Sequence, residues 1–350
     1  MSLLAAPALP PLDAVACEPT LAAASAAATT TAVSVSVCEG ETLIRLQPRH
    51  GIGARDVLLR WRLHGSAGAP LLAVLGGISA DRRVVGDTDG PGWWDALAGA
   101  GRAIDPAHLR ILGIDWLDAR DLDAPAVDSA DQADALAALL DALALPRLHA
   151  LVGSSYGAMV GLAFATRHPR RLRRLVAIAG AHRAHAQAAA LRAVQRSIVR
   201  FALERGDVKT GLALARQLAM IGYRSPRELA RRFDVPAMLR HGRVRVAAED
   251  WLDATGARFA QRFGAERFLS LSESIDLHAV DPAAVRVPTA LVGFASDQLV
   301  PVADLCALQR GLGAPCELHV LDSDYGHDAF LKEGMALGAL LRGCLASCGG

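Results

Sequence analysis

Long hydrophobic runs and any excess of charge of one sign are missing from this sequence. Although 52% of its 350 residues are hydrophobic, no apolar run reaches the roughly 20 residues of a membrane-spanning helix. Lys and Arg together number 37 and Asp and Glu 36, so the net charge is +1. This balance gives no electrostatic basis for binding nucleic acid or an anionic membrane. We therefore expect partners that are small molecules, with no nucleic acid and no membrane.

Closely spaced pairs of cysteines are also missing. None of the six cysteines forms a Cys-x-x-Cys pair, which is a common signature of zinc and redox sites. The nearest pair, Cys344 and Cys348, fits one face of a terminal helix better than a metal site. We expect reduced thiols, a cytoplasmic location, no metal and no bound cofactor.

Basic residues are missing from the start of the chain. No Lys or Arg precedes Arg45, whereas a secretory signal needs positive charge near its start. Residues 1–36 are rich in Ala, Thr and Pro, and we expect them to be a disordered, low-complexity extension outside the fold. A cleaved targeting peptide is the alternative.

The stretch Leu148–Gly157 contains a short apolar run that ends in Gly-Ser-Ser-Tyr-Gly, and a helix-like run follows at once. Gly-x-Ser-x-Gly between a strand and a helix is the nucleophile elbow of α/β-hydrolase folds. The glycines leave room for a sharp turn that lifts the hydroxyl of Ser155 above the sheet. The pattern by itself is weak, and its position between a strand and a helix is what favours a nucleophile.

Apolar runs and helical patterns alternate along most of the chain. Thr42–Gln47 and Asp56–Leu63 alternate polar and apolar residues, as in an antiparallel hairpin. Continuous apolar runs, typical of strands buried on both faces, then alternate with helices; they are Pro70–Leu75, Leu109–Asp115, Leu148–Val152, Leu172–Ala179, Thr289–Phe294 and Cys316–Leu321. A short helical segment is predicted to begin at Gly92. A helix is predicted over Ser129–Leu143, with Ser129 as its N-cap, and the last helix is predicted over Ala329–Leu345. The alternation predicts a doubly wound, mostly parallel sheet.

The alternation stops after Gly180. From Ala181 to about Leu277 the pattern is helical, with Arg on the polar faces and no convincing strand. We expect an α/β-hydrolase core made of residues 37–180 and 281–350, with residues 181–280 inserted as a helical cap over the active site.

A serine nucleophile needs a base within hydrogen-bond reach and an acid that orients the base. In α/β-hydrolases these follow the serine in the order acid, then histidine. Asp297 follows the strand Thr289–Phe294, and His327 lies between the last strand and the last helix. These positions predict Ser155 as nucleophile, His327 as base and acid, and Asp297 as the orienting group. The remaining histidines, His319 among them, are expected to be packed or solvated.

Gly76-Gly77-Ile78-Ser79 follows the buried strand Pro70–Leu75. Alone, it reads as a turn that ends the strand. Beside a serine nucleophile, glycines here suit an oxyanion loop, in which backbone N–H groups point at the reacting oxygen. The expected donors are the amides of Ile78 and Tyr156.

Several stretches resemble the homoserine O-acyltransferases of methionine biosynthesis, of the α/β-hydrolase type. They are Pro91–Asp95 with Gly101–Asp105, Gly211–Arg216 with Tyr223, Ser272–Leu277, Ser296–Pro301 and Gly326–Leu331. The resemblance runs from about residue 40 to the C-terminus. Its most specific parts are the Arg216/Tyr223 pair and the Asp that directly follows His327.

The resemblance implies roles beyond the triad. Arg216 would bind the amino-acid carboxylate with support from Tyr223, two helical turns away on the same face. Asp328 would pair with the substrate ammonium. A solvated cap arginine is the plainer interpretation of Arg216. The family further implies acyl-CoA as co-substrate and a homodimer.

Two stretches depart from the family's usual acetyltransferase pattern. The oxyanion loop is Gly-Gly-Ile-Ser instead of His-Ala-Leu-Thr, and Trp116–Asp121 replaces a Gly-Pro-Ser segment. Both look like a divergent subgroup for which succinyl transfer is expected. The distal carboxylate of succinyl needs a cation, and Arg183, Arg192 and Arg196 are the candidates.

The predicted reaction is therefore ping-pong transfer of succinyl, with acetyl as the other possible donor group, from acyl-CoA to L-homoserine. Two alternatives stay open at this point. L-Serine could be the acceptor, because one methylene changes specificity by only ~1–3 kcal/mol. Water could be the acceptor, which would make the protein an esterase.

Overall fold

The computed structural model describes residues 36–346, which form an eight-stranded sheet of order β1-β2-β4-β3-β5-β6-β9-β10. The pairs β1–β2 and β2–β4 are antiparallel, and every pair from β4 to β10 is parallel. The predicted hairpin and mostly parallel sheet are thus confirmed. The strands are Val37–Leu46 (β1), Arg55–His64 (β2), Leu71–Leu75 (β3), Arg110–Ile114 (β4), Ala150–Ser154 (β5), Leu175–Ile178 (β6), Thr289–Phe294 (β9) and Cys316–Leu321 (β10).

Burial on both faces explains the continuous apolar runs. Every residue of β3, β5, β6 and β9 is buried. One face packs against α1 (Ser129–Ala142), α2 (Tyr156–Arg167) and α8 (Val302–Gly311). The other packs against α10 (Gly334–Ala346) and the loop that carries Trp94. The sheet is therefore the middle layer of the fold, and its central strands end at the site described below.

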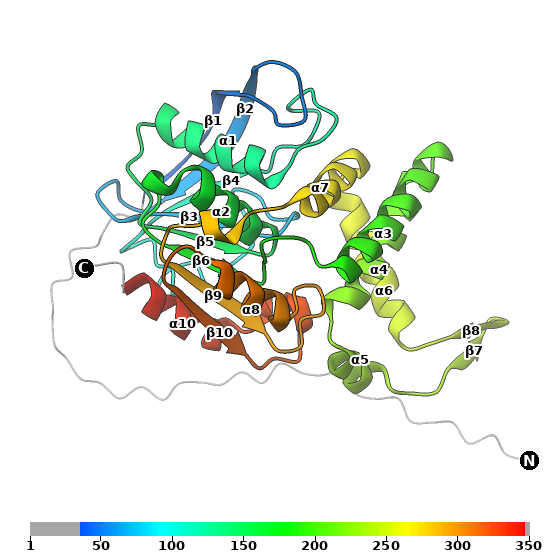
Figure 1. Ribbon diagram of the computed structural model, residues 1–350. Coiled ribbons are helices and arrows are strands. Elements are labelled where there is room, and N and C mark those ends of the chain that lie inside the picture. Colours follow the sequence, from blue (N-terminus) through cyan, green and yellow to red (C-terminus); the bar gives the residue numbers. More distant parts are fainter. Residues whose placement is uncertain (1–35, 347–350) are drawn as a thin grey trace, which may run out of the picture. The chain divides into compact units, whose positions relative to one another are not determined.

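Between β6 and β9 the chain leaves the sheet and forms α3 (Ala186–Glu204), α4 (Val208–Tyr223), α5 (Pro226–Phe233), α6 (Ala248–Arg262) and α7 (Ala265–Leu277). Figure 1 shows α3, α4, α5 and α6 grouped beside the sheet. These helices have a small apolar core of their own, which includes Val199, Leu212 and Phe268. A helical insertion over these residues matches the sequence prediction, although the exact domain boundaries stay a prediction.

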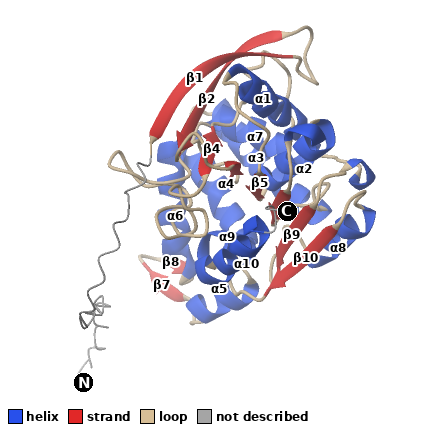
Figure 2. Ribbon diagram, turned by 90° about the vertical axis from the view of Figure 1, so that its left-hand side faces the viewer, coloured by secondary structure: helices blue, strands red, loops and turns tan. Residues whose placement is uncertain are grey.

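A short hairpin in this insertion was not predicted. Strands β7 (Met238–Arg240) and β8 (Arg243–Arg245) pair with each other and lie next to α5 and α6, separate from the main sheet (Figure 2). His241 and Gly242 both have positive φ, of 49° and 75°, as a two-residue hairpin turn requires. The strands are mostly exposed, so they carry no buried apolar pattern that could reveal them.

Three local predictions were wrong in detail. The N-cap of helix α1 is Asp128, not Ser129. The Asp128 carboxylate accepts hydrogen bonds from two amides of the first turn, and the Asp131 carboxylate accepts one from the Asp128 amide. The segment after Gly92 forms turns, since Asp95 binds the amides of Gly86 and Gly92. The last helix is split into α9 (Ala329–Lys332) and α10.

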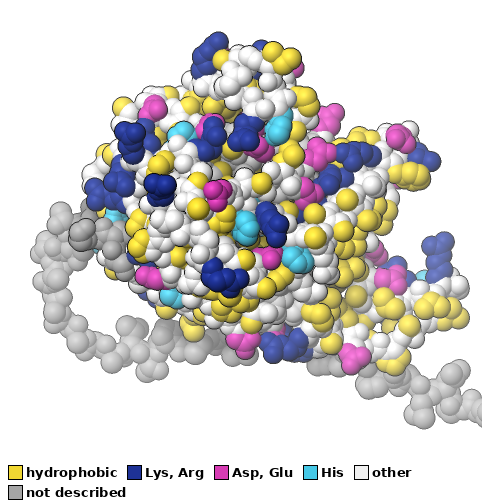
Figure 3. Space-filling view, in the orientation of Figure 1, with side chains coloured by type: hydrophobic (Ala, Val, Ile, Leu, Met, Phe, Trp, Pro, Cys, Tyr) yellow, Lys and Arg dark blue, Asp and Glu magenta, His cyan; other side chains and the backbone are white. Residues whose placement is uncertain are grey.

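Charge is mixed along the surface. Figure 3 shows basic side chains (Lys and Arg) interspersed with acidic ones on the face in view, as the net charge of +1 suggests. No helix within residues 36–346 is long and apolar enough to cross a membrane. The predicted extension, residues 1–36, lies outside the described residues except for Ser36.

Candidate active site

Ser155 lies on a strained turn between β5 and α2. Its φ is 54° and its ψ is −118°, a backbone conformation that costs of order 1–3 kcal/mol for a residue with a side chain. A Cβ at Gly153 would lie 2.2 Å from the Gly157 carbonyl oxygen, and one at Gly157 would lie 2.2 Å from that of Leu75. Both glycines of the motif are therefore required by close backbone packing.

The structure brings the three predicted triad residues together. Ser155 Oγ lies 2.8 Å from His327 Nε2, and His327 Nδ1 lies 2.8 Å from Asp297 Oδ2. The other oxygen of Asp297 accepts bonds from the amides of Leu299 and Val300, at 2.8 and 3.0 Å. The carboxylate is thus held in place while it faces the imidazole, and this arrangement can move a proton from Ser155 to His327.

The surroundings of His327 raise its pKa. Burial of the ring by itself would lower the pKa, but the charge of Asp297 and its hydrogen bond outweigh burial, and Asp328 acts in the same direction. Arg192 acts in the opposite direction. The balance stabilises the imidazolium form that a general base passes through.

The loop after β3 lies beside the nucleophile. The Gly157 amide donates to the Gly76 carbonyl oxygen at 2.8 Å, and Trp116 Nε1 donates to that of Gly77 at 3.0 Å. The structure gives no hydrogen-bond acceptor within residues 36–346 for the amides of Ile78 and Tyr156. Unpaired amides near the nucleophile are what an oxyanion site requires, and the role of Ile78 and Tyr156 as donors stays a prediction.

Two separate cavities lie near the triad. The larger has a volume of about 1440 Å³ and lies between the sheet and the cap; Ile78, Trp116, Arg216 and Asp328 are among its lining residues. The smaller, of about 40 Å³, is lined by Ser155 and His327 themselves. Tyr156 forms part of its wall and is anchored through its hydroxyl, 2.5 Å from Ser274 Oγ. Ser155 thus lies at the small cavity, next to the large one.

Arg216 extends from α4 into the large cavity without an acidic partner in the described part of the chain. Its guanidinium lies 5.2 Å from the ring of Tyr223 and 5.1 Å from that of Phe259. Its Nε is buried and has no hydrogen-bond partner within residues 36–346. The residue as a whole is half-buried and lines the cavity, so its guanidinium is open to a ligand anion. The plainer interpretation of Arg216 as a solvated arginine stays open.

Tyr223 connects Arg216 to the triad. Its ring lies 5.8 Å from that of His327. Gly326, just before His327, has a φ of 61°, and a Cβ there would lie 2.6 Å from the Tyr223 carbonyl oxygen. The loop that carries the base is therefore packed tightly against the end of α4.

Asp328 also lines the large cavity, but it already has a partner. Its Oδ2 lies 3.2 Å from Arg224 Nη2, and Arg224 in turn pairs with Glu228 at 3.2 Å. Burial raises the pKa of Asp328, while Arg224 and Arg216 oppose the rise. Arg224 and Glu228 were not predicted as site residues. Their spacing of four residues was a possible signal, but it is equally common on solvated helices.

Only two of the three arginines proposed for acyl specificity line the small cavity. Arg183 and Arg192 line it. Arg196 is not among its lining residues, and it donates to Ser272 and to Asp276. Their role in specificity stays a prediction.

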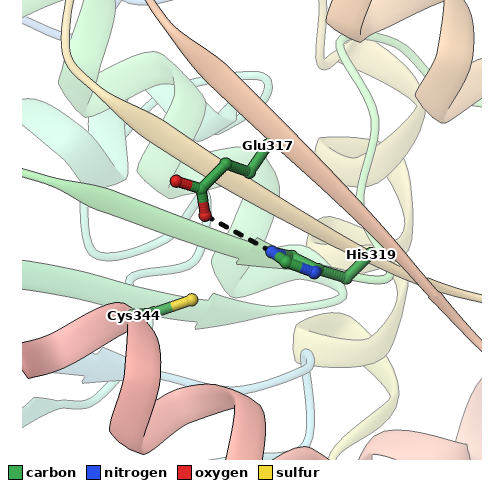
Figure 4. Close-up of side chains that lie close together, drawn as sticks. All are labelled: Glu317, His319 and Cys344. Atoms are coloured by element: carbon green, nitrogen blue, oxygen red, sulfur yellow. Dashed lines mark hydrogen bonds and ion pairs between the residues drawn. The ribbon is translucent and has the colours of Figure 1, made fainter. Parts of the chain in front are cut away.

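Another group of potential metal ligands lies outside this site. Ligand atoms of Glu317, His319 and Cys344 lie within 4.8 Å of one another, where β10 passes α10 (Figure 4). Arg174 lies 3.2 Å from the Glu317 carboxylate and competes with any cation for it. We assign no metal to this group, and the expected absence of a metal at the active site stays a prediction.

Comparisons with known proteins agree with this geometry. A family model described as the alpha/beta hydrolase fold matches residues 77–334. A homoserine O-succinyltransferase of Xanthomonas campestris pv. campestris is 54% identical over 89% of this chain and 84% of its own length. A homoserine O-acetyltransferase of Clavibacter michiganensis subsp. michiganensis is 34% identical over 78% of this chain and 82% of its own.

The chain belongs to the homoserine O-acyltransferase family of α/β-hydrolase fold.

Solved structures support the fold of this acyltransferase family member. The homoserine O-acetyltransferase of Bacillus anthracis superposes with a TM-score of 0.79 at 16% identity, over 88% of this chain and 97% of that one. Esterase E22 superposes with a TM-score of 0.78 at 18% identity, over 89% of this chain and all of that one. Transferases and esterases thus share this fold, and side chains at the site must distinguish them.

Proposed function

We propose that this protein transfers a succinyl group from succinyl-CoA to the hydroxyl of L-homoserine. The observation that carries the proposal is the guanidinium of Arg216, which lines the large cavity beside Tyr223 and has no acidic partner within residues 36–346. An esterase that uses water needs no such anion-binding group. The 54% identical relative bears the name homoserine O-succinyltransferase, and it supports succinyl over acetyl as the donor group.

In the first half-reaction, Ser155 Oγ attacks the thioester carbonyl carbon while its proton passes to His327 Nε2, 2.8 Å away. The amides of Ile78 and Tyr156 stabilise the oxyanion. When the tetrahedral intermediate collapses, the C–S bond breaks and the CoA thiolate takes the proton from His327. Ser155 is left as an acyl ester.

In the second half-reaction, His327 removes the proton of the homoserine hydroxyl, whose oxygen attacks the acyl ester. Collapse of the second intermediate breaks the bond to Ser155 Oγ, which takes the proton back from His327. Arg216 holds the homoserine carboxylate, and Asp328 holds its ammonium. Tyr223, whose ring is close to both the Arg216 guanidinium and the His327 ring, fixes the distance between the bound amino acid and the base.

Acyl-CoA enters as a co-substrate, and we propose no bound cofactor. The large cavity carries basic side chains suited to the phosphates of CoA. Arg258 and Arg262 line it and have no acidic partner within residues 36–346. The cap above the sheet limits the access of water to the acyl ester.

Three further expectations come from the family alone. We propose a place in methionine biosynthesis, a homodimer and a cytoplasmic location. Their support is the kinship with homoserine acyltransferases, and each stays a prediction.

The test is an acyl-transfer experiment in two stages. The protein is incubated with succinyl-CoA or acetyl-CoA, and the acyl-enzyme is detected by intact mass. The adduct is then chased with L-homoserine, L-serine or buffer. We expect a succinyl adduct that homoserine discharges faster than serine or water. If neither donor acylates the protein, or if water discharges the adduct as fast as homoserine, the proposal is wrong.

A further inference from the structure

The small cavity behind Ser155 is separate from the one that holds Arg216. Ser155, Tyr223 and His327 line it, together with apolar side chains such as Met159 and Ile275. An apolar pocket would suffice for a short acyl chain such as acetyl. The lining also includes Arg183, His185, Arg192 and Asp304, and these charged and polar groups need a separate explanation.

Arg192 lines this cavity and is held from one side. Its Nε donates to Asp276 Oδ1 at 2.7 Å, and the buried Nη2 lies 2.6 Å from the same oxygen without hydrogen-bond geometry. The guanidinium is thus anchored to α7 through these two nitrogens. Its Nη1 has no hydrogen-bond partner within residues 36–346 and can donate to the carboxylate of a ligand.

Arg196 keeps Arg192 from being neutralised by Asp276. Arg196 Nη1 lies 2.6 Å from Asp276 Oδ2 and also donates to Ser272. Two guanidiniums therefore share a single carboxylate, and positive charge remains beside the cavity.

Two further groups at the cavity add to this picture. Arg183 is exposed and has no acidic partner within 4 Å in the described part of the chain. The Nδ1 of His185 is buried and has no hydrogen-bond partner within residues 36–346. Asp304 is the opposing charge, so the cavity wall carries two arginines against one carboxylate.

We propose that this cavity is the acyl subsite, that Arg192 with Arg183 binds the distal carboxylate of the succinyl group there, and that Arg196 acts only by positioning Arg192 through Asp276. The inference rests on the proposed function and adds the residues that select the donor. The sequence analysis gave Arg183, Arg192 and Arg196 the same role. The inference now distinguishes them, because only Arg183 and Arg192 line the cavity.

The size of the cavity fits this assignment. A water needs roughly 10–15 Å³ of such volume, so about 40 Å³ accommodates about three water-sized groups. The two methylenes and the carboxylate of succinyl, beyond its thioester carbonyl, are of about this size. Acetyl would leave the charged end of the cavity to water.

The test compares kcat/KM for succinyl-CoA and acetyl-CoA in Arg192→Met and Arg183→Met, with acyl-enzyme formation followed by intact mass. For Arg192→Met we expect kcat/KM with succinyl-CoA to fall about 10- to 100-fold, while acetyl-CoA changes less than threefold. Arg192→Lys should recover part of the loss. Arg183 has no ion pair to break, so Arg183→Met tests the subsite even if Arg192→Met fails to fold.

Arg200→Met is the matched control, because Arg200 lies on the same helix and pairs with Glu273 away from the cavity. It should leave both donors unchanged. Equal losses for the two donors in Arg192→Met and Arg183→Met would overturn the inference. Arg196→Lys tests positioning, since it should retain selectivity if Arg196 acts through Asp276.

The wild-type protein separates this inference from the proposed function. If it forms no adduct with either donor, both are wrong. If it forms adducts and passes them to homoserine, but the arginine variants do not change the ratio of donors, the proposed function stands and the acyl subsite lies elsewhere.

Discussion

Replacing Arg216 by methionine should impair the second half-reaction while sparing the first. The side chain lies beside Tyr223 and Phe259, and its buried Nε has no partner within residues 36–346. Methionine keeps much of the apolar stem, so packing is largely retained. A hydrogen-bonded charge pair contributes about 1.5–3 kcal/mol, which corresponds to a loss of about 10- to 150-fold in kcat/KM for homoserine.

The two half-reactions can be measured separately. Release of CoA in a single turnover reports acylation of Ser155, and decay of the adduct with increasing homoserine reports transfer. We expect acylation of the Arg216→Met variant within about threefold of wild type and a sharply weaker dependence on homoserine. Arg205→Met is the control, because Arg205 also lies over an aromatic ring, that of Phe201, but outside the site.

The assignment of Arg216 would be refuted by either of two results. One is an unchanged dependence on homoserine. The other is a loss in acylation as large as the loss in transfer, which would indicate a general structural role.

Three further outcomes are expected. Ser155→Ala should form no adduct by intact mass, and an adduct in this variant would exclude Ser155 as the nucleophile. The base must be neutral and the pKa of His327 is raised, so the acylation rate should fall about tenfold per pH unit below that pKa. The Asp297→Asn variant should show this fall at lower pH and a rate reduced about 10⁴-fold. An unchanged pH profile in this variant would contradict the triad. Gly157→Ala should lower the free energy of unfolding by about 1–3 kcal/mol or more in denaturant unfolding. Gly264→Ala is the control, because a Cβ there has free space, and it should change the free energy of unfolding by less than about 1 kcal/mol. Similar losses in the two variants would contradict the packing argument.

The residues proposed to select donor and acceptor come from the cap, whereas the triad follows strands of the sheet. Ser155, Asp297 and His327 all follow strands of the sheet, at the carboxyl ends of β5, β9 and β10. Arg192, Arg216 and Tyr223 come from α3 and α4 of the insertion. Changes in the insertion can therefore alter donor and acceptor while the triad stays intact.

Local sterics made the elbow readable from sequence. The turn at Ser155 needs a glycine at position 153 because the Gly157 carbonyl oxygen lies 2.2 Å from where a Cβ would be, and this approach is contained within the five-residue motif. The approach to Gly157 comes instead from the Leu75 carbonyl oxygen on β3. The order of the triad and the apolar runs of β3, β5, β6 and β9 were readable for a similar reason, since burial on both faces leaves a continuous apolar pattern.

Pairings between distant segments were decided by the tertiary structure alone. Arg192 and Arg196 meet Asp276 from α7, about 80 residues further along the chain. Arg224, which also pairs with Glu228, holds Asp328 from another part of the chain. Arginines are frequent throughout the insertion. Their spacing along the chain therefore does not distinguish a guanidinium that has an acidic partner from one that has none. The sequence by itself determined the fold and predicted the three triad residues that the structure brings together. The tertiary structure decided which charged groups have a partner and which have none, because charge is compensated through space and not along the chain.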